Sequence, residues 1–319
     1  MRYTISLCLA TLLLSGTALA GVPRVVTDIA PVHSLVAMVM GDLGQPDLLV
    51  GNGADPHSFQ LRPSQAASLQ QADMIIWMGH AMTPWLKRML DSLSANAIQI
   101  ELLDAAVTVT RSYADDSADD HAAEQTTAIA KAGPQPGGAG EAPPHDGTDP
   151  HAWLDPRNAT AWLALIANQL SALDPANAAI YAANATAGAA QIAAVEAEII
   201  TLLAPVKTRP FVVYHDAYGY FSGHFGLTVA GELALGDATN PSAAKLAGLR
   251  ATLISGSPVC IFPEANHDTK LLTQIAEGTA ITVGAALDPE GAALPPGPAL
   301  YPNLLRGLAT TLADCLTKT

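Results

Sequence analysis

Three histidines stand in short segments that also carry acidic residues, and this combination favours a metal site. His57 and His151 each follow an Asp-Pro pair, and His215 precedes an aspartate. A carboxylate can orient an imidazole through its second ring nitrogen, and a proline restricts the backbone beside it. Three imidazoles form a nitrogen-rich donor set that suits zinc better than magnesium, calcium or manganese. Asp288, which precedes a proline, is the candidate for a fourth ligand.

The other histidines in ordered-looking sequence lack these surroundings. His33 begins a predicted helix, where we expect a capping or surface role. Three more share no common pattern and are expected to be surface or satisfied core residues: His80, His224 and His267.

Alternating strands and helices must position the first candidate ligand. Short apolar runs predict strands, and longer periodic runs, some opened by proline, predict helices. The predicted strands are 24–27, 47–50, 74–78 and 97–100, and the helices between them are 31–40, 63–72 and 82–93. This alternation indicates a mostly parallel sheet.

A second alternation follows two long helices. An apolar-periodic helix at 158–173 precedes an alanine-rich helix at 175–203, which would be roughly 43 Å long. The later strands are 211–214, 227–230, 259–262 and 281–283, with helices at 217–225, 242–255, 269–277 and 302–316.

We therefore predict an α/β protein of two similar lobes, each with a four-stranded, mostly parallel sheet and flanking helices, joined by a long rigid spine helix. The expected boundaries are 21–173 for the N-terminal lobe, 174–204 for the spine and 205–319 for the C-terminal lobe.

The carboxyl ends of the strands gather the candidate ligands. His57 follows the second strand and His151 follows the fourth, while His215 comes directly after the first strand of the second half. Asp288 follows the eighth strand. Ligands bind at these strand ends in open parallel sheets, so the four residues could line one cleft between the lobes.

Residues 111–147 form a polar tract inside the first lobe. It is rich in acidic residues, glycine and proline and has almost no large apolar side chains. It cannot offset the entropy of ordering, so we expect it to be mobile. It is either a solvated linker or a weak metal-collecting loop that uses His121 and His145.

Residues 1–20 are typical of a secretory signal peptide. Arg2 supplies the basic end, 5–14 the apolar stretch, and Ala18-Leu19-Ala20 the cleavage signal. The apolar run is too short to span a membrane, and we expect no later span. No cysteine follows a cleavage site to carry a lipid anchor. We expect a soluble protein exported to the periplasm.

Charge and cysteine content narrow the partners further. The formal net charge of −14 becomes −15 once the signal peptide, with Arg2 and no acid, is removed. This excess of acid argues against nucleic acid or an anionic membrane as a partner.

Cleavage of the signal peptide leaves only Cys260 and Cys315. An oxidising compartment favours a disulfide between them, with two buried thiols as the alternative.

Three motifs resemble the metal-site motifs of the metal-binding substrate-binding proteins of ABC importers, the cluster A-I family. They are Asp55-Pro56-His57-Ser58-Phe59 with Leu61-Arg62-Pro63-Ser64, then Asp149-Pro150-His151-Ala152-Trp153-Leu154-Asp155-Pro156, then Tyr214-His215-Asp216-Ala217-Tyr218-Gly219-Tyr220-Phe221. The resemblance covers essentially the whole mature chain. It implies two four-stranded lobes, a spine helix, a metal site between the lobes, and a permease partner at the inner membrane.

Within that family a histidine in the third motif, here His215, goes with zinc importers, and a glutamate goes with manganese and iron importers. The cysteine pair also resembles the zinc branch. Some zinc members carry a glutamate just before the first ligand histidine, where this chain has Pro56, so the fourth ligand is Asp288 or a water. The resemblance implies a periplasmic, monomeric, high-affinity Zn²⁺-binding protein that delivers its ion to the permease.

Two alternatives stay open. One is a manganese- or iron-binding protein of the same fold. The other is a secreted zinc hydrolase, because three histidines with an open fourth position also form a catalytic arrangement. The sequence has no His-Glu-x-x-His helix and no serine nucleophile motif, so we expect a binding protein and no enzyme.

Overall fold

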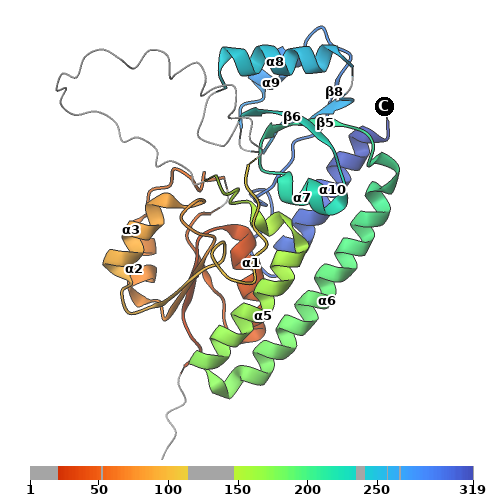
Figure 1. Cartoon of the computed structure of the whole chain (residues 1–319). Coiled ribbons are helices and arrows are strands. Elements are labelled where there is room, and N and C mark those ends of the chain that lie inside the picture. Colours follow the sequence, from red (N-terminus) through yellow and green to blue (C-terminus); the bar gives the residue numbers. More distant parts are fainter. Residues whose placement is uncertain are drawn as a thin grey trace, which may run out of the picture.

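The computed structural model of the 319-residue chain describes residues 21–51, 53–113, 147–234, 241–256, 258–265 and 267–318. The predicted signal peptide, His121 and His145 lie outside these ranges. Two sheets, each flanked by helices, lie at the two ends of a set of long helices (Figure 1). We refer to the first sheet with its helices as the N-terminal lobe and to the second as the C-terminal lobe.

The N-terminal lobe contains a four-stranded parallel sheet in the order β2-β1-β3-β4. The strands are β1 (Val25–Thr27), β2 (Asp47–Leu48), β3 (Met74–Trp77) and β4 (Ile98–Glu101). The helices are α1 (Ala30–Met40), η1 (Gly41–Leu43), α2 (Pro63–Gln71) and α3 (Pro84–Leu93). Proline opens α2 and α3, which suits a first helical position because that amide has no partner inside the helix.

The C-terminal lobe repeats this strand order as β6-β5-β7-β8, again all parallel. Its strands are β5 (Phe211–His215), β6 (Val229–Ala234), β7 (Cys260–Ile261) and β8 (Thr282–Val283). Its helices are α7 (Gly219–Phe225), α8 (Ala243–Ile254), α9 (Lys270–Ala276) and α10 (Leu300–Leu316). The predicted fold of two similar four-stranded lobes is confirmed.

Long helices join the lobes. They are α5 (Pro156–Leu173) and α6 (Ala178–Leu203), and short 3₁₀ turns adjoin them: η2 (Ala152–Leu154), η3 (Pro175–Asn177) and η4 (Ala204–Val206). The predicted spine therefore starts with a 3₁₀ turn before 26 residues of α-helix. One stripe of α6 is buried, at spacings of three and four residues: Tyr181, Ala185, Gly188, Ile192, Val195, Ile199 and Leu203. That stripe packs against α5, α1 and α10.

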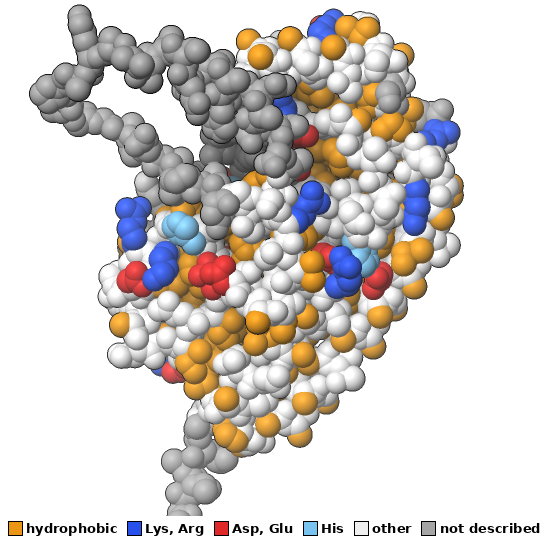
Figure 2. All heavy atoms as spheres, in the orientation of Figure 1, with side chains coloured by type: hydrophobic (Ala, Val, Ile, Leu, Met, Phe, Trp, Pro, Cys, Tyr) orange, Lys and Arg blue, Asp and Glu red, His pale blue; other side chains and the backbone are white. Residues whose placement is uncertain are grey.

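One helix is longer and more apolar than we expected of any segment after the first 20 residues. Among the described residues, Pro175–Val206 is the single helix long and apolar enough to cross a membrane by length and composition, with a mean hydropathy of 1.5. Alanine is the commonest residue of this helix, and the surface over α5 and α6 is largely uncharged (Figure 2). In the structure the helix is the spine between the lobes (Figure 1).

The C-terminal helix α10 is a second link between the lobes. Near its start the Tyr301 amide donates to the Ser34 hydroxyl in α1, and the Tyr301 hydroxyl donates to the Trp153 carbonyl. Near its end the predicted disulfide joins Cys315 to Cys260 in β7. One hydrophobic core consequently runs from α1 through α5, α6 and α10 to β5.

Candidate metal centre

The structure brings the three candidate histidines to one place between the lobes. His57 lies in the loop after β2, His151 directly precedes η2, and His215 is the last residue of β5. The ring centroids of His151 and His215 are 5.2 Å apart, and those of His57 and His151 are 6.4 Å apart. His57 and His151 follow the carboxyl end of a strand in chain order, and His215 forms one, which is where open parallel sheets place their ligands.

His151 and His215 already stand at metal-ligand separation. Their Nε2 atoms are 3.3 Å apart, and each residue is 1% exposed. A tetrahedral zinc ion with Zn–N bonds of about 2.0–2.1 Å holds two ligand nitrogens about 3.3 Å apart. The same geometry puts two ligand ring centroids about 5.2 Å apart. We call these two residues the histidine pair.

A buried carboxylate orients each member of the histidine pair. Asp149 Oδ1 is 2.8 Å from His151 Nδ1, and Glu264 Oε2 is 2.5 Å from His215 Nδ1. Asp149 and Glu264 are 1% and 4% exposed. With the Nδ1 proton held by a carboxylate, the lone pair of each Nε2 atom is directed into the cleft.

Glu264 was missed by the sequence reasoning. It lies just past β7, the third strand of its sheet, and its position obeys the same strand-end rule that pointed to the histidines. The signal was therefore present in the sequence. Acidic residues are common at loop starts, however, and nothing local showed that this one faces His215.

His57 belongs to a less constrained segment. Asp55 holds the loop locally, because its carboxylate accepts hydrogen bonds from the His57 amide at 2.8 Å and the Ser58 hydroxyl at 2.5 Å. Trp85 Nε1 donates to the Pro56 carbonyl at 2.7 Å. The His57–His151 centroid distance of 6.4 Å exceeds the value for a tetrahedral pair, about 5.2 Å, by roughly 1 Å. Among the described residues no three His, Cys, Asp or Glu side chains are grouped closely enough to hold an ion.

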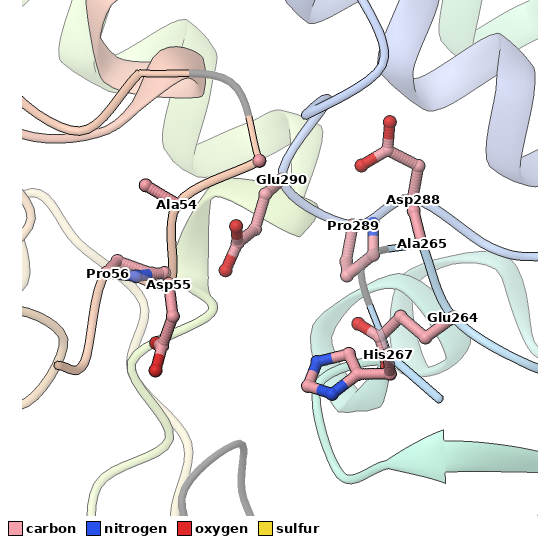
Figure 3. A pocket seen from close by; sticks show the side chains of 10 residues that line it. Ala54, Asp55, Pro56, Glu264, Ala265, His267, Asp288, Pro289 and Glu290 are labelled. Atoms are coloured by element: carbon pink, nitrogen blue, oxygen red, sulfur yellow. The ribbon is translucent and has the colours of Figure 1, made fainter. Parts of the chain in front are cut away.

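Asp288 stands beside the centre, but its carboxylate is engaged elsewhere. Its two oxygens accept hydrogen bonds from the Ala292 and Ala293 amides at 2.8 and 2.9 Å. In Figure 3 the carboxylate points away from Glu264 and His267. Coordination by Asp288 would have to break these hydrogen bonds, and its role as fourth ligand stays a prediction.

A cleft of about 310 Å³ opens next to the histidine pair, between the loop before His57 and two loops of the C-terminal lobe. Acidic residues and one histidine line it: Asp55, Glu264, His267, Asp288 and Glu290 (Figure 3). The His267 ring stacks on Tyr214, with centroids 4.4 Å apart, and lies 6.3 Å from the ring of His215. Carboxylates on both sides of the opening favour entry of a cation.

The remaining histidines have other partners. His224 is wedged between Asp155 and Glu196, at 3.4 and 2.8 Å, as a satisfied core residue. His33 is buried, with Nε2 near the Pro46 carbonyl, and burial lowers its pKa. His80 is exposed on the N-terminal lobe.

Negative charge accumulates around the histidine pair. Asp216 follows His215 directly, and burial, reinforced by the Asp149 and Glu232 carboxylates, raises the pKa of Asp216 above its usual value. The positive charge of Arg111 partly offsets this negative charge, because its Nε atom lies 3.6 Å from Asp149 Oδ2. A divalent cation entering the cleft therefore meets imidazole nitrogens backed by carboxylates, which is an arrangement that stabilises added positive charge.

Known proteins match this chain over nearly its whole length. Residues 25–315 match the family described as "Zinc-uptake complex component A periplasmic". A high-affinity zinc uptake system protein ZnuA from Paracoccus denitrificans is 52% identical over 307 residues, which cover 94% of this chain and 93% of that protein. A protein of the same name from Brucella suis is 35% identical, with complete coverage of both chains.

Solved structures show the same architecture. A zinc-bound ZnuA deletion mutant superposes with a TM-score of 0.70 at 25% identity, covering 92% of this chain and 98% of that chain. The laminin-binding protein Lmb of Streptococcus agalactiae gives a TM-score of 0.72 at 25% identity, with 92% and 99% coverage. A manganese-bound metal-binding protein from Candidatus Liberibacter asiaticus gives 0.73, but its 21% identity supports the fold alone.

Proposed function

The chain belongs to the family of periplasmic zinc-uptake components, and from this premise we propose that it captures Zn²⁺ between its lobes and delivers it to an ABC importer permease. The ion is cargo, and the protein performs no chemistry on it. We propose His57, His151 and His215 as its protein ligands. The fourth position falls to Asp288 or, as the engaged Asp288 carboxylate favours, to a water.

One observation carries this proposal. The histidine pair presents two Nε2 atoms 3.3 Å apart, and each imidazole is fixed by a buried carboxylate on its other nitrogen. Burying two imidazoles and two carboxylates costs free energy, so this grouping stabilises the fold poorly unless a cation joins it. The nitrogen separation matches that of a tetrahedral zinc site.

Zinc is the ion that this donor set suits best. Three imidazoles are neutral and leave the ion few oxygen ligands, which zinc tolerates and manganese does not prefer. The relatives named for zinc uptake support the same choice.

Binding is also favoured over hydrolysis by a specific contact pattern. A zinc hydrolase needs a general base beside the metal-bound water. Asp149 and Glu264 are the carboxylates that touch the histidine pair, and each is held by an imidazole Nδ1. Neither is poised to take a proton from water.

We further propose that the mature chain starts at Gly21, acts as a monomer in the periplasm, and uses neither nucleic acid nor a membrane surface as a partner. Its units would be the lobe 21–173, the spine 174–204 and the lobe 205–319, with α10 linking back to α1.

The expected weak metal binding by His121 and His145 would be auxiliary. Deleting 115–146 should remove any weak zinc equivalents and leave the tight one, as measured by titration calorimetry.

The deciding experiment is a competition titration of the mature protein with Zn²⁺ and Mn²⁺ against a chelator of known affinity, at fixed pH. We expect one tight zinc equivalent and weaker manganese binding. The exposed His80→Ala variant is the matched control and should bind as the wild type does. Manganese binding as tight as zinc binding would overturn the choice of ion.

A further inference from the structure

We propose that Arg111 is a positioning residue that locks the two strand-end segments carrying the histidine pair to one another before the metal arrives. This inference rests on the proposed function, because it concerns the same metal centre. Arg111 is the first residue of the polar tract, and its guanidinium reaches across to α7 in the C-terminal lobe. Arg111 therefore contacts both the segment that carries His151 and the helix that follows His215, and it is not itself a ligand.

The backbone around Arg111 is tied to the His151 segment and to α7. The Asp149 amide donates to the Arg111 carbonyl at 2.9 Å. The Arg111 amide donates to the Tyr220 hydroxyl at 2.9 Å, and that hydroxyl donates to the Asp149 carbonyl at 3.0 Å. Burial raises the pKa of the Tyr220 phenol above its usual range, so the hydroxyl remains a donor.

The Arg111 side chain makes a second set of contacts with the same two segments. Its guanidinium carbon lies 5.7 Å from the centroid of the Tyr220 ring, within range of a cation–π interaction. Its Nε atom lies 3.6 Å from Asp149 Oδ2, while Asp149 Oδ1 holds His151. Arg111 thus contacts Asp149, and Asp149 in turn holds the His151 ring.

Gly219 makes this arrangement possible. A Cβ atom built on Gly219, the first residue of α7, would lie 2.1 Å from Arg111 Nη1 and 2.2 Å from Cζ. The guanidinium therefore occupies the place that any other side chain would take. Gly219 follows His215 by four residues, so this contact joins the His215 segment to the segment that holds Asp149 and His151.

The consequence for metal capture is preorganisation. Asp149 is almost completely buried, and the Arg111 guanidinium forms an ion pair with its second oxygen, with Nε 3.6 Å from Oδ2, which offsets the buried negative charge. Without that partner the carboxylate can turn and take the His151 ring with it. The 3.3 Å separation of the two Nε2 atoms would then have to be recreated on binding, which lowers the affinity.

Two substitutions remove the same contact from opposite sides, which makes the proposal testable. Arg111→Ala deletes the guanidinium. Gly219→Ala keeps Arg111 but fills its place, and the displaced group is the end of a flexible side chain. Alanine is also a better helix former than glycine, so α7 should not be weakened. Gly223→Ala is the matched control. It lies on the same helix, but its Cβ atom would lie 3.9 Å from Arg111 Nη1, at ordinary van der Waals distance.

The experiment measures zinc dissociation constants by chelator competition for the wild type, the three single variants and the Arg111→Ala/Gly219→Ala double variant. The d–d absorption of bound Co²⁺ reports the geometry of the ligand set. We expect each of Arg111→Ala and Gly219→Ala to weaken zinc binding about tenfold and to alter the cobalt spectrum. The double variant should be no weaker than Arg111→Ala alone, since both changes remove one interaction. Gly223→Ala should match the wild type.

Either of two results would overturn the inference. In the first, Gly219→Ala binds zinc and cobalt as Gly223→Ala does. In the second, the zinc affinity of the double variant falls about a hundredfold, which is what two independent tenfold losses would give. A wild type that binds no zinc would instead refute the proposed function, so the two failures are distinguishable.

Discussion

The two sides of the metal centre are built differently. The histidine pair is buried, stands at ligand separation, and has each ring fixed by a carboxylate from another part of the fold or from the preceding turn. His57 is half-buried on a loop in which Asp55 accepts hydrogen bonds from the His57 amide and the Ser58 hydroxyl, and Trp85 donates to the Pro56 carbonyl. One side is formed by folding, and the other is completed by binding.

This difference assigns separate roles to the two sides. The histidine pair gains its geometry from core packing, so a metal finds it ready and binds it without further ordering cost. The His57 ring lies roughly 1 Å farther from His151 than in a tetrahedral set, so we expect part of its bond energy to be spent on bringing the ring to the ion. Removing a member of the pair should therefore weaken binding more than removing His57.

The largest expected effect comes from deleting the ligands one at a time. His151→Ala and His215→Ala should each weaken zinc binding about a thousandfold, about 4.1 kcal/mol. His57→Ala should cost about a hundredfold, because the closing movement is also saved. Titration calorimetry with chelator competition measures all three, with His80→Ala as the control. Equal losses at all three histidines would remove the distinction between the two sides.

The carboxylates that fix the histidine pair should have the next largest effect. Asp149→Asn and Glu264→Gln keep the shape of each side chain but weaken the hold on the Nδ1 proton, and changes of this kind usually cost 10–100-fold in metal affinity, about 1.4–2.7 kcal/mol. Asp55→Asn, whose carboxylate accepts hydrogen bonds from the His57 amide and the Ser58 hydroxyl, is the comparison and should cost less. A larger loss from Asp55→Asn would reverse the assignment of rigid and adaptable sides.

The choice of ion should follow His215. His215→Glu replaces a nitrogen donor by an anionic oxygen donor on the rigid side of the centre. We expect the ratio of zinc to manganese affinity to fall about tenfold, about 1.4 kcal/mol, although zinc can still bind more tightly. Side-by-side competition titrations of the variant and the wild type measure this ratio. An unchanged ratio would mean that His215 does not set the selectivity.

The smallest effect is expected at Asp288. Because both carboxylate oxygens accept backbone hydrogen bonds, Asp288→Asn should change zinc affinity less than about threefold, well below the 10–100-fold expected for carboxylates that touch a ligand. The same competition titration measures this change in affinity. Thermal unfolding shows whether the substitution also destabilises the turn that contains Asp288. A loss of tenfold or more without destabilisation would establish Asp288 as the fourth ligand.

The elements of the fold could be predicted closely because their signals are local. Apolar runs gave the eight strands, and α2, α3 and α5 each begin at a proline. The remaining differences are at element ends. Strand β2 ends at Leu48, although the Leu49 and Val50 amides still bond to the Thr27 and Asp28 carbonyls. Such ends depend on pairing with a neighbouring strand, which the sequence does not display.

By itself, the sequence determined the two-lobe fold, the three histidines at strand ends and the cysteine pair, because periodicity and residue type act over a few neighbouring positions. Only the tertiary structure decided that Glu264 fixes His215 across 49 residues and that Arg111 occupies the place left by Gly219. It also decided that Asp288 turns toward its own loop. These contacts join segments whose relative orientation is set by the packing of both sheets on α5, α6 and α10, and no local pattern encodes that orientation.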